Sequence, residues 1–181
     1  MRRPTTDWIT GAIGPKETSM NTKFVQGAVA AFALAVVPAL SASAQGAPEL
    51  PATHMLTLEA AEAIMEAAQT EAAKNGASSI VIVDTSGAPV LMHRMDGAFP
   101  ASAAIAQGKA ETAAAFRAST TNMEGGVNGP RAALLSSGYM MMQGGLPLMV
   151  DDQVVGAIGV SGGTKEQDEA VAAAGTAVLA K

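Results

Sequence analysis

The 181-residue sequence contains no cysteine, which excludes disulfides, thiol catalysis and thiolate-bound metals. Aromatic residues make up 3% of the chain and histidines number two, so the sequence offers no stacking platform for nucleic acid and no histidine cluster for a metal. The phosphate-binding glycine loop, the G-x-S-x-G nucleophile turn and the HExxH zinc motif are also missing. These absences favour a protein without catalytic turnover, although they leave its enzymatic status open.

A long apolar run at residues 24–40 is too short and too interrupted to be favoured as a retained membrane span. An A-x-A cleavage site follows it and ends at Ala44. Residues 20–44 are therefore predicted to be a signal peptide, with Gln45 as the mature N-terminus of a periplasmic or secreted protein. Residues 1–19 precede a second methionine and are predicted to be an over-extended start.

The predicted mature protein has a net negative charge. Cleavage removes four of the 11 basic residues and two of the 16 acidic residues, which leaves seven against 14 and a formal charge of −7. A surface of this sign repels nucleic acid, and no basic patch offsets it. We therefore expect a small-molecule or protein partner and no nucleic acid.

Periodicity and turn residues predict the order α-β-β-α-(α)-β-β-α after a flexible leader at residues 45–55. Two hairpins in place of alternating β-α-β units favour an antiparallel sheet with helices packed on it, an α+β domain over residues 56–181. The predicted ranges are helix 57–75 ended by a left-handed Gly76, strands 79–84 and 89–95, helix 102–118, an irregular stretch 119–130, a short helix 131–137, strands 146–150 and 154–160, and helix 165–179.

The C-terminal region carries the clearest local signals. The Asp151-Asp152 pair between two apolar runs predicts a tight hairpin turn with positive φ. Gly156 and Gly159 interrupt the second of these runs, which indicates either close approach of another backbone or a β-bulge. Thr164 followed by Gln167 predicts a capping box at the start of the last helix, and this structural role is favoured over an anion site.

Few residues are candidates for chemistry. His93, preceded by Met92, is competent as an axial haem ligand, although a lone histidine on a strand is more often structural or exposed. Lys109, in an alanine-rich helix, is either solvated or points into a pocket to pair with a ligand carboxylate. Glu59 and Glu62 share a helix face and would bind a metal cation only weakly, so an exposed acidic face is the favoured interpretation.

Six blocks in collinear order cover about residues 56–180. They are Thr57–Ala61, Ile82–Gly87, Arg94–Ala98, Lys109–Ala113, Gly144–Pro147 and Gly156–Asp168. The chain resembles the GlcG/HbpS family on these blocks, and this family in turn resembles the C-terminal domain of some PduO-type corrinoid adenosyltransferases. The resemblance implies a profilin-like α/β layered domain with an antiparallel sheet of about five strands. It also implies assembly into homo-oligomers and haem as the cofactor.

Carried onto this sequence, the resemblance implies His93 and Thr112 as candidate haem ligands. Glu59-x-x-Glu62 resembles acidic pairs proposed for iron in secreted members. Some of those members pass a redox signal to a membrane sensor kinase, so haem or iron sensing with a membrane sensor partner is implied as well. The leading hypothesis is an exported haem-binding protein that does not insert stably into the membrane.

Two alternative hypotheses stay open. Arg94 and Lys109 would hold the carboxylate of a small organic acid such as glycolate while Asp96 moves protons, in a binding protein or an enzyme. Alternatively, the acidic helices or Met140–Met142 would dock another protein. The methionine run is interpreted first as core or subunit contact and second as a groove for a flat apolar ligand.

Overall fold

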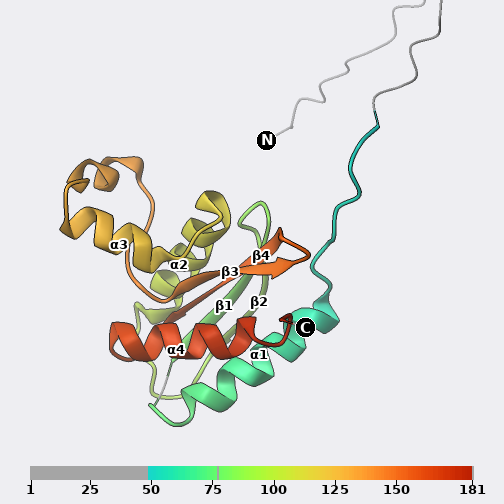
Figure 1. Ribbon diagram of the computed structural model, residues 1–181. Coiled ribbons are helices and arrows are strands. Elements are labelled where there is room, and N and C mark those ends of the chain that lie inside the picture. Colours follow the sequence, from blue (N-terminus) through green and yellow to red (C-terminus); the bar gives the residue numbers. More distant parts are fainter. Residues whose placement is uncertain (1–48, 77, 181) are drawn as a thin grey trace, which may run out of the picture. The chain divides into compact units, whose positions relative to one another are not determined.

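Two β-hairpins pair side by side to build one antiparallel sheet (Figure 1). The computed structural model describes residues 49–76 and 78–180. The strands are β1 (Ser79–Asp84), β2 (Pro89–Arg94), β3 (Gly145–Val150) and β4 (Gln153–Ser161). They are arranged in the order β2-β1-β4-β3, so β1 and β4 are central and β2 and β3 form the edges.

The described sheet has four strands, and the expectation of about five was wrong. The two hairpins use all of the sequence that has strand character. The segment that leads into β3 contains Gly138 and Gly144, both with positive φ, and such backbone does not extend a sheet. The α+β class and the antiparallel pairing are confirmed.

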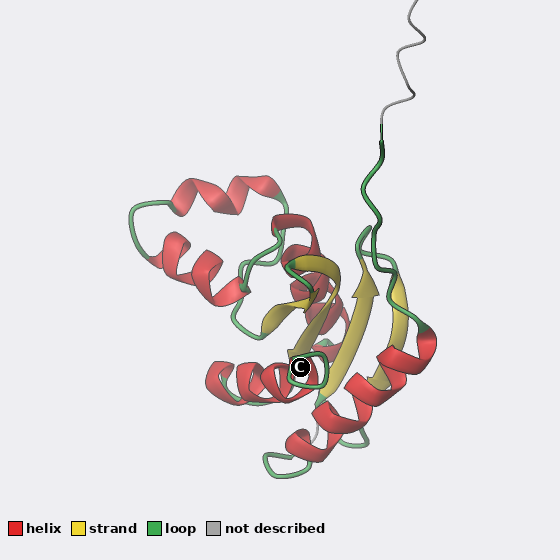
Figure 2. Ribbon diagram, turned by 45° about the vertical axis from the view of Figure 1, so that its right-hand side comes forward, coloured by secondary structure: helices red, strands yellow, loops and turns green. Residues whose placement is uncertain are grey.

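Helices cover both faces of the sheet (Figures 1 and 2). Helices α1 (Leu58–Ala72) and α4 (Lys165–Thr176) pack against each other on one face, and α2 (Ser102–Phe116) covers the other face. The first core combines α1 and α4 side chains with the strand residues Ile80, Ile82, Leu148, Ile158 and Val160. The second core contains only valine and alanine side chains, which brings α2 close to the sheet.

The predicted turns and caps are confirmed. Asp151 and Asp152 have φ of 47° and 62° and close the β3–β4 hairpin. The Thr57 side chain accepts a hydrogen bond from the backbone of Ala60, and Thr164 forms the complete capping box with Gln167. In the β1–β2 turn, hydrogen bonds from the Ser86 side chain and from nearby backbone N–H groups lower the pKa of Asp84.

Two predicted boundaries were wrong. The stretch 119–130 is largely helical, as α3 (Thr120–Asn128), because the Ser119 hydroxyl caps it and Thr120 bonds to the backbone of Gly145. The 3₁₀ helix η1 (Ala132–Ser137) follows it, and the two stand away from the sheet (Figures 1 and 2). Helix α1 ends at Ala72, before the left-handed Gly76, because its last hydrogen bonds tighten to i→i−3 spacing.

Parts of the sequence interpretation fall outside the described residues. The predicted over-extended start (1–19), the signal peptide (20–44) and residues 45–48 of the leader are in this position. No helix within 49–76 and 78–180 is long and apolar enough to cross a membrane.

Glycines at the contact between α2 and the sheet remove the side chains that would keep the two apart. A Cβ added at Gly159 would lie 2.1 Å from the carbonyl oxygen of Ala106, and one at Gly145 would lie 2.5 Å from that of Lys109. Both distances are far below van der Waals contact. The α2 backbone therefore rests directly on β3 and β4, and of the two alternatives predicted for Gly159 the structure shows the close backbone approach.

We expect Gly159→Ala to destabilise the domain by about 2–3 kcal/mol, because the helix must move away from the sheet to admit a methyl group. Gly125→Ala is the matched control. It lies inside α3 with no atom within 4 Å of an added Cβ, and it should stabilise by up to about 1 kcal/mol through helix propensity. Urea unfolding measures both changes, and an unchanged midpoint for Gly159→Ala would contradict the close contact.

Candidate functional site

The edge strand β2 presents the predicted haem-site residues on two different faces of the sheet. His93 is paired with Ile80, whose side chain belongs to the core under α1 and α4. Met92 is paired with Val81, which belongs to the core under α2. Directly paired side chains share a face. His93 and Met92 of one chain therefore cannot both ligate the same iron atom.

His93 is exposed and its ring is oriented by α1. The amide nitrogen of Gln69 lies 2.7 Å from Nδ1 of His93, and Nε2 has no hydrogen-bond partner among the described residues. A flip of the Gln69 side-chain amide exchanges its NH₂ donor and its oxygen acceptor. Gln69 can therefore form a hydrogen bond with either tautomer of the His93 ring. If the Gln69 oxygen accepts from Nδ1–H, the lone pair of the ring is on Nε2. A metal-binding histidine requires this arrangement.

Arg94 and Asp96 lie beside a small cleft on the chain after β2. The cleft has a volume of about 250 Å³ and is lined by residues 94–98. One nitrogen of Arg94 donates to the carbonyl of Ala98 at 3.0 Å, so the bend itself uses part of the guanidinium. This volume lies below the roughly 300–1,000 Å³ of typical ligand sites. The cleft accommodates a small anion more readily than a macrocycle.

Lys109 is 2% exposed and has an internal partner. Its Nζ lies 2.7 Å from Oδ2 of Asp168 and 2.8 Å from the carbonyl oxygen of Val160. The other oxygen of Asp168 accepts from the backbone N–H of Gly163. Lys109 therefore pairs with the carboxylate of Asp168 and not with that of a ligand, which weakens the organic-acid hypothesis.

Thr112 is fully buried, and its hydroxyl donates to the carbonyl of Gly108 at 2.7 Å on the same helix. A hydroxyl that bonds back to the preceding turn is satisfied without any ligand. The structure does not bring Thr112 together with His93. A haem-ligand role for Thr112 would require α2 to open.

Glu59 and Glu62 are both exposed on α1. Residues 49–76 and 78–180 contain no group of three or more histidine, aspartate or glutamate side chains placed to hold a metal ion. The arrangement thus leaves the two glutamates on a solvated acidic face. A third oxygen ligand would have to come from outside the described chain.

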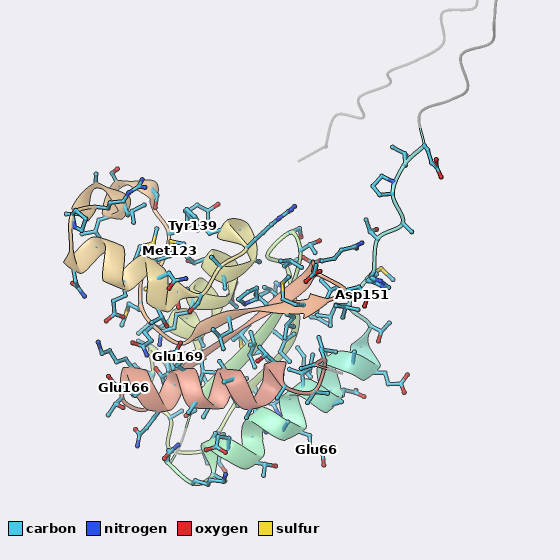
Figure 3. All side chains as sticks on the ribbon, in the orientation of Figure 1. Glu66, Met123, Tyr139, Asp151, Glu166 and Glu169 are labelled. Carbon is cyan, nitrogen blue, oxygen red and sulfur yellow. The ribbon has the colours of Figure 1, made fainter. Side chains whose placement is uncertain are left out.

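The methionine run is divided between the core and the surface. Met141 is buried and Met142 is 46% exposed, while Met140 packs against Gly108 on the outside of α2. The neighbouring ring of Tyr139, labelled in Figure 3, meets Phe116 edge to face with centroids 5.1 Å apart. Met140 thus helps to cover α2, and the burial of Met141 agrees with the core interpretation.

A polar network that the sequence did not reveal attaches α3 to the rest of the domain. Glu169, on α4 in Figure 3, accepts hydrogen bonds from the Thr121 hydroxyl and the Gln143 amide. Glu124 accepts from the backbone of Gln143 and pairs with Lys165. These partners lie far apart in the sequence, and no local pattern links them.

The fold and this site define a layered α+β domain with an exposed edge-strand histidine. A family model described as "Haem degrading protein HbpS-like" matches residues 56–177, and the chain belongs to this family. It is 44% identical to Protein GlcG of Escherichia coli (strain K12) over 109 residues, which are 59% of this chain and 81% of that protein.

Solved structures agree with this assignment. The crystal structure of HbpS superimposes with a TM-score of 0.65 at 33% identity, covering 72% of this chain and 94% of HbpS. The crystal structure of a PduOC:heme complex gives a TM-score of 0.64 at 27% identity, covering 70% of this chain and 96% of that one. The GlcG/HbpS membership and the relation to PduO predicted from the sequence are confirmed.

Removing one partner of the buried ion pair should be costly. We expect Lys109→Met to lower the free energy of unfolding by about 3–5 kcal/mol, because the Asp168 carboxylate is then buried without a cation. The double variant with Asp168→Leu should recover much of this loss. Lys165→Met, which breaks the more exposed pair with Glu124, is the matched control and should cost less than about 1 kcal/mol. Equal effects of the two lysine substitutions in urea unfolding would contradict the buried pair.

Proposed function

We propose that this protein binds haem at the β2 edge, with Nε2 of His93 as an axial ligand of the iron. The main support is the exposed His93 ring. Gln69 orients it at Nδ1, and Nε2 has no hydrogen-bond partner among the described residues. Membership of the HbpS-like family and the haem complex of a relative support the choice of ligand. Haem iron commonly takes a histidine on one axial side.

The geometry favours His93 over the other candidate ligands. Met92 is exposed on the opposite face of β2, and Thr112 is buried with its hydroxyl already bonded. An edge strand contacts only one side of a flat ligand. The second side of the haem would therefore face water or a further copy of the chain, which accords with the homo-oligomer that the resemblance implies.

Hemin titration of the purified protein should give a saturable Soret band that His93→Ala shifts or weakens. Gln69→Leu should weaken binding by about tenfold or more, because the ring loses its orienting partner. Met92→Ala is the matched control on the other face and should leave the band unchanged. Light scattering on the same samples gives the number of chains per haem.

Unchanged binding in His93→Ala would refute the proposed ligand, and loss of the band in Met92→Ala would move the site to the α2 face. The absence of any saturable band would refute haem binding altogether. A band that decays only when a reductant is added would show turnover and contradict a purely binding role.

We also propose that the protein acts after export, as the A-x-A site at Ala42–Ala44 indicates. Expression of the full-length chain in a bacterium with a general secretory pathway should yield a periplasmic product whose intact mass begins at Gln45. A chain expressed from Met20 should give the same product. Recovery of a protein that retains residues 20–44 would contradict cleavage.

A further inference from the structure

A second cleft lies at the opposite end of the sheet from His93. His93 pairs with Ile80 near the start of β1, whereas Thr85, which lines this cleft, follows the end of β1. The cleft has a volume of about 460 Å³, within the roughly 300–1,000 Å³ of small-molecule sites. Four stretches of chain converge on it, and its lining consists of residues 51–54, Thr85, Arg117 and residues 152–154.

One wall of the cleft is the segment before α1, which is held in place by the β3–β4 hairpin. The Gln153 side chain accepts from the backbone N–H of His54 and donates to the carbonyl of Ala52, both at 3.3 Å. Nε2 of His54 lies 3.2 Å from a carboxylate oxygen of Asp151, which Figure 3 labels at the tip of the hairpin. Hydrophobic burial of Leu56 anchors the segment at its other end. This part of the expected flexible leader therefore forms a defined surface.

The cleft contains two opposite charges that do not neutralise each other. Arg117 and Asp152 are both exposed, and neither forms an ion pair or a side-chain hydrogen bond with another residue of the described chain. Arg117 comes from the end of α2 and Asp152 from the hairpin turn, so their backbones are fixed independently. Two separated, unpaired charges in one hollow match a ligand that carries both signs.

The charge pattern excludes the simpler ligand classes. A dianion would meet the carboxylate of Asp152, and a diamine would meet the guanidinium of Arg117. A net-neutral zwitterion satisfies the guanidinium with its carboxylate, in the bidentate geometry that arginine favours, and satisfies Asp152 with its ammonium. The remaining lining is polar or weakly apolar, with Thr85, Gln153 and Val154, and suits a modest side chain.

We propose that this cleft binds a free neutral α-amino acid, its carboxylate on Arg117 and its ammonium on Asp152. The site is separate from the β2 edge, so the proposal does not depend on haem binding. It gives the domain a second small-molecule ligand, at the surface where the segment before α1, α2 and the C-terminal hairpin meet.

Isothermal titration of the full haem-free protein with glycine, L-alanine, L-serine, L-glutamine and L-leucine tests the proposal. We expect saturable binding of at least one of them. For L-glutamine, the matched probes are 4-carbamoylbutanoate, which lacks the ammonium, and 4-aminobutanamide, which lacks the carboxylate. Each corresponding probe should bind about tenfold more weakly or worse than its parent amino acid, because one charged hydrogen-bonded contact is lost.

Arg117→Gln and Asp152→Asn should each weaken binding by about tenfold or more for the same reason. Arg131→Gln removes an exposed arginine outside the cleft and should leave the affinity unchanged, as should His93→Ala. Circular dichroism confirms that each variant is folded. The proposal is overturned if none of the five amino acids gives saturable heat, or if Arg117→Gln and Asp152→Asn bind the amino acid as strongly as the unsubstituted protein does.

Discussion

The buried ion pair between Lys109 and Asp168 is the interaction on which the rest of the domain depends. It joins α2 to α4 past the end of β4, whose Val160 carbonyl also accepts from the lysine. Desolvating two charges is expensive, so the pair is tolerated because every polar atom in it is bonded. Space for the lysine depends on Gly144, where an added Cβ would lie 3.1 Å from Nζ.

The two proposed ligand sites lie at opposite ends of the sheet and do not include the ion pair or the glycine contact. The strand order places β2 at one edge of the sheet, where His93 is exposed. At the other end, the turn after β1 and the end of α2 border the charged cleft. None of the largest fully buried side chains of the described chain comes from β2 or from the lining of the charged cleft. The residues that stabilise the fold are therefore different from those proposed to bind ligands.

The sequence predicted correctly those turns and helix caps that depend only on residues close together in the chain. The Asp151-Asp152 turn and the Thr164 capping box depend on neighbours within a few residues, and both were correct. Lys109 finds Asp168 59 positions away, and His93 finds Gln69 24 positions away, so neither partner was visible in a single sequence. Helix α3 was missed because Gly125 and Gly126 suggest a loop, whereas its anchor, the Thr120–Gly145 hydrogen bond, is tertiary. Matched family blocks predicted the fold, but not which side chains share a face.

Direct seating of the α2 backbone on the sheet also limits how the domain can respond to a ligand. Interlocked side chains can slide between rotamers, but a helix in backbone contact with Gly145 and Gly159 has no such freedom. Sheet and helix must therefore shift as one rigid plate. Hydrogen bonds made by Thr120, Thr121 and Glu124 join the α3–η1 arm to that plate, so the arm is the part of the domain that can change position while the plate keeps its shape.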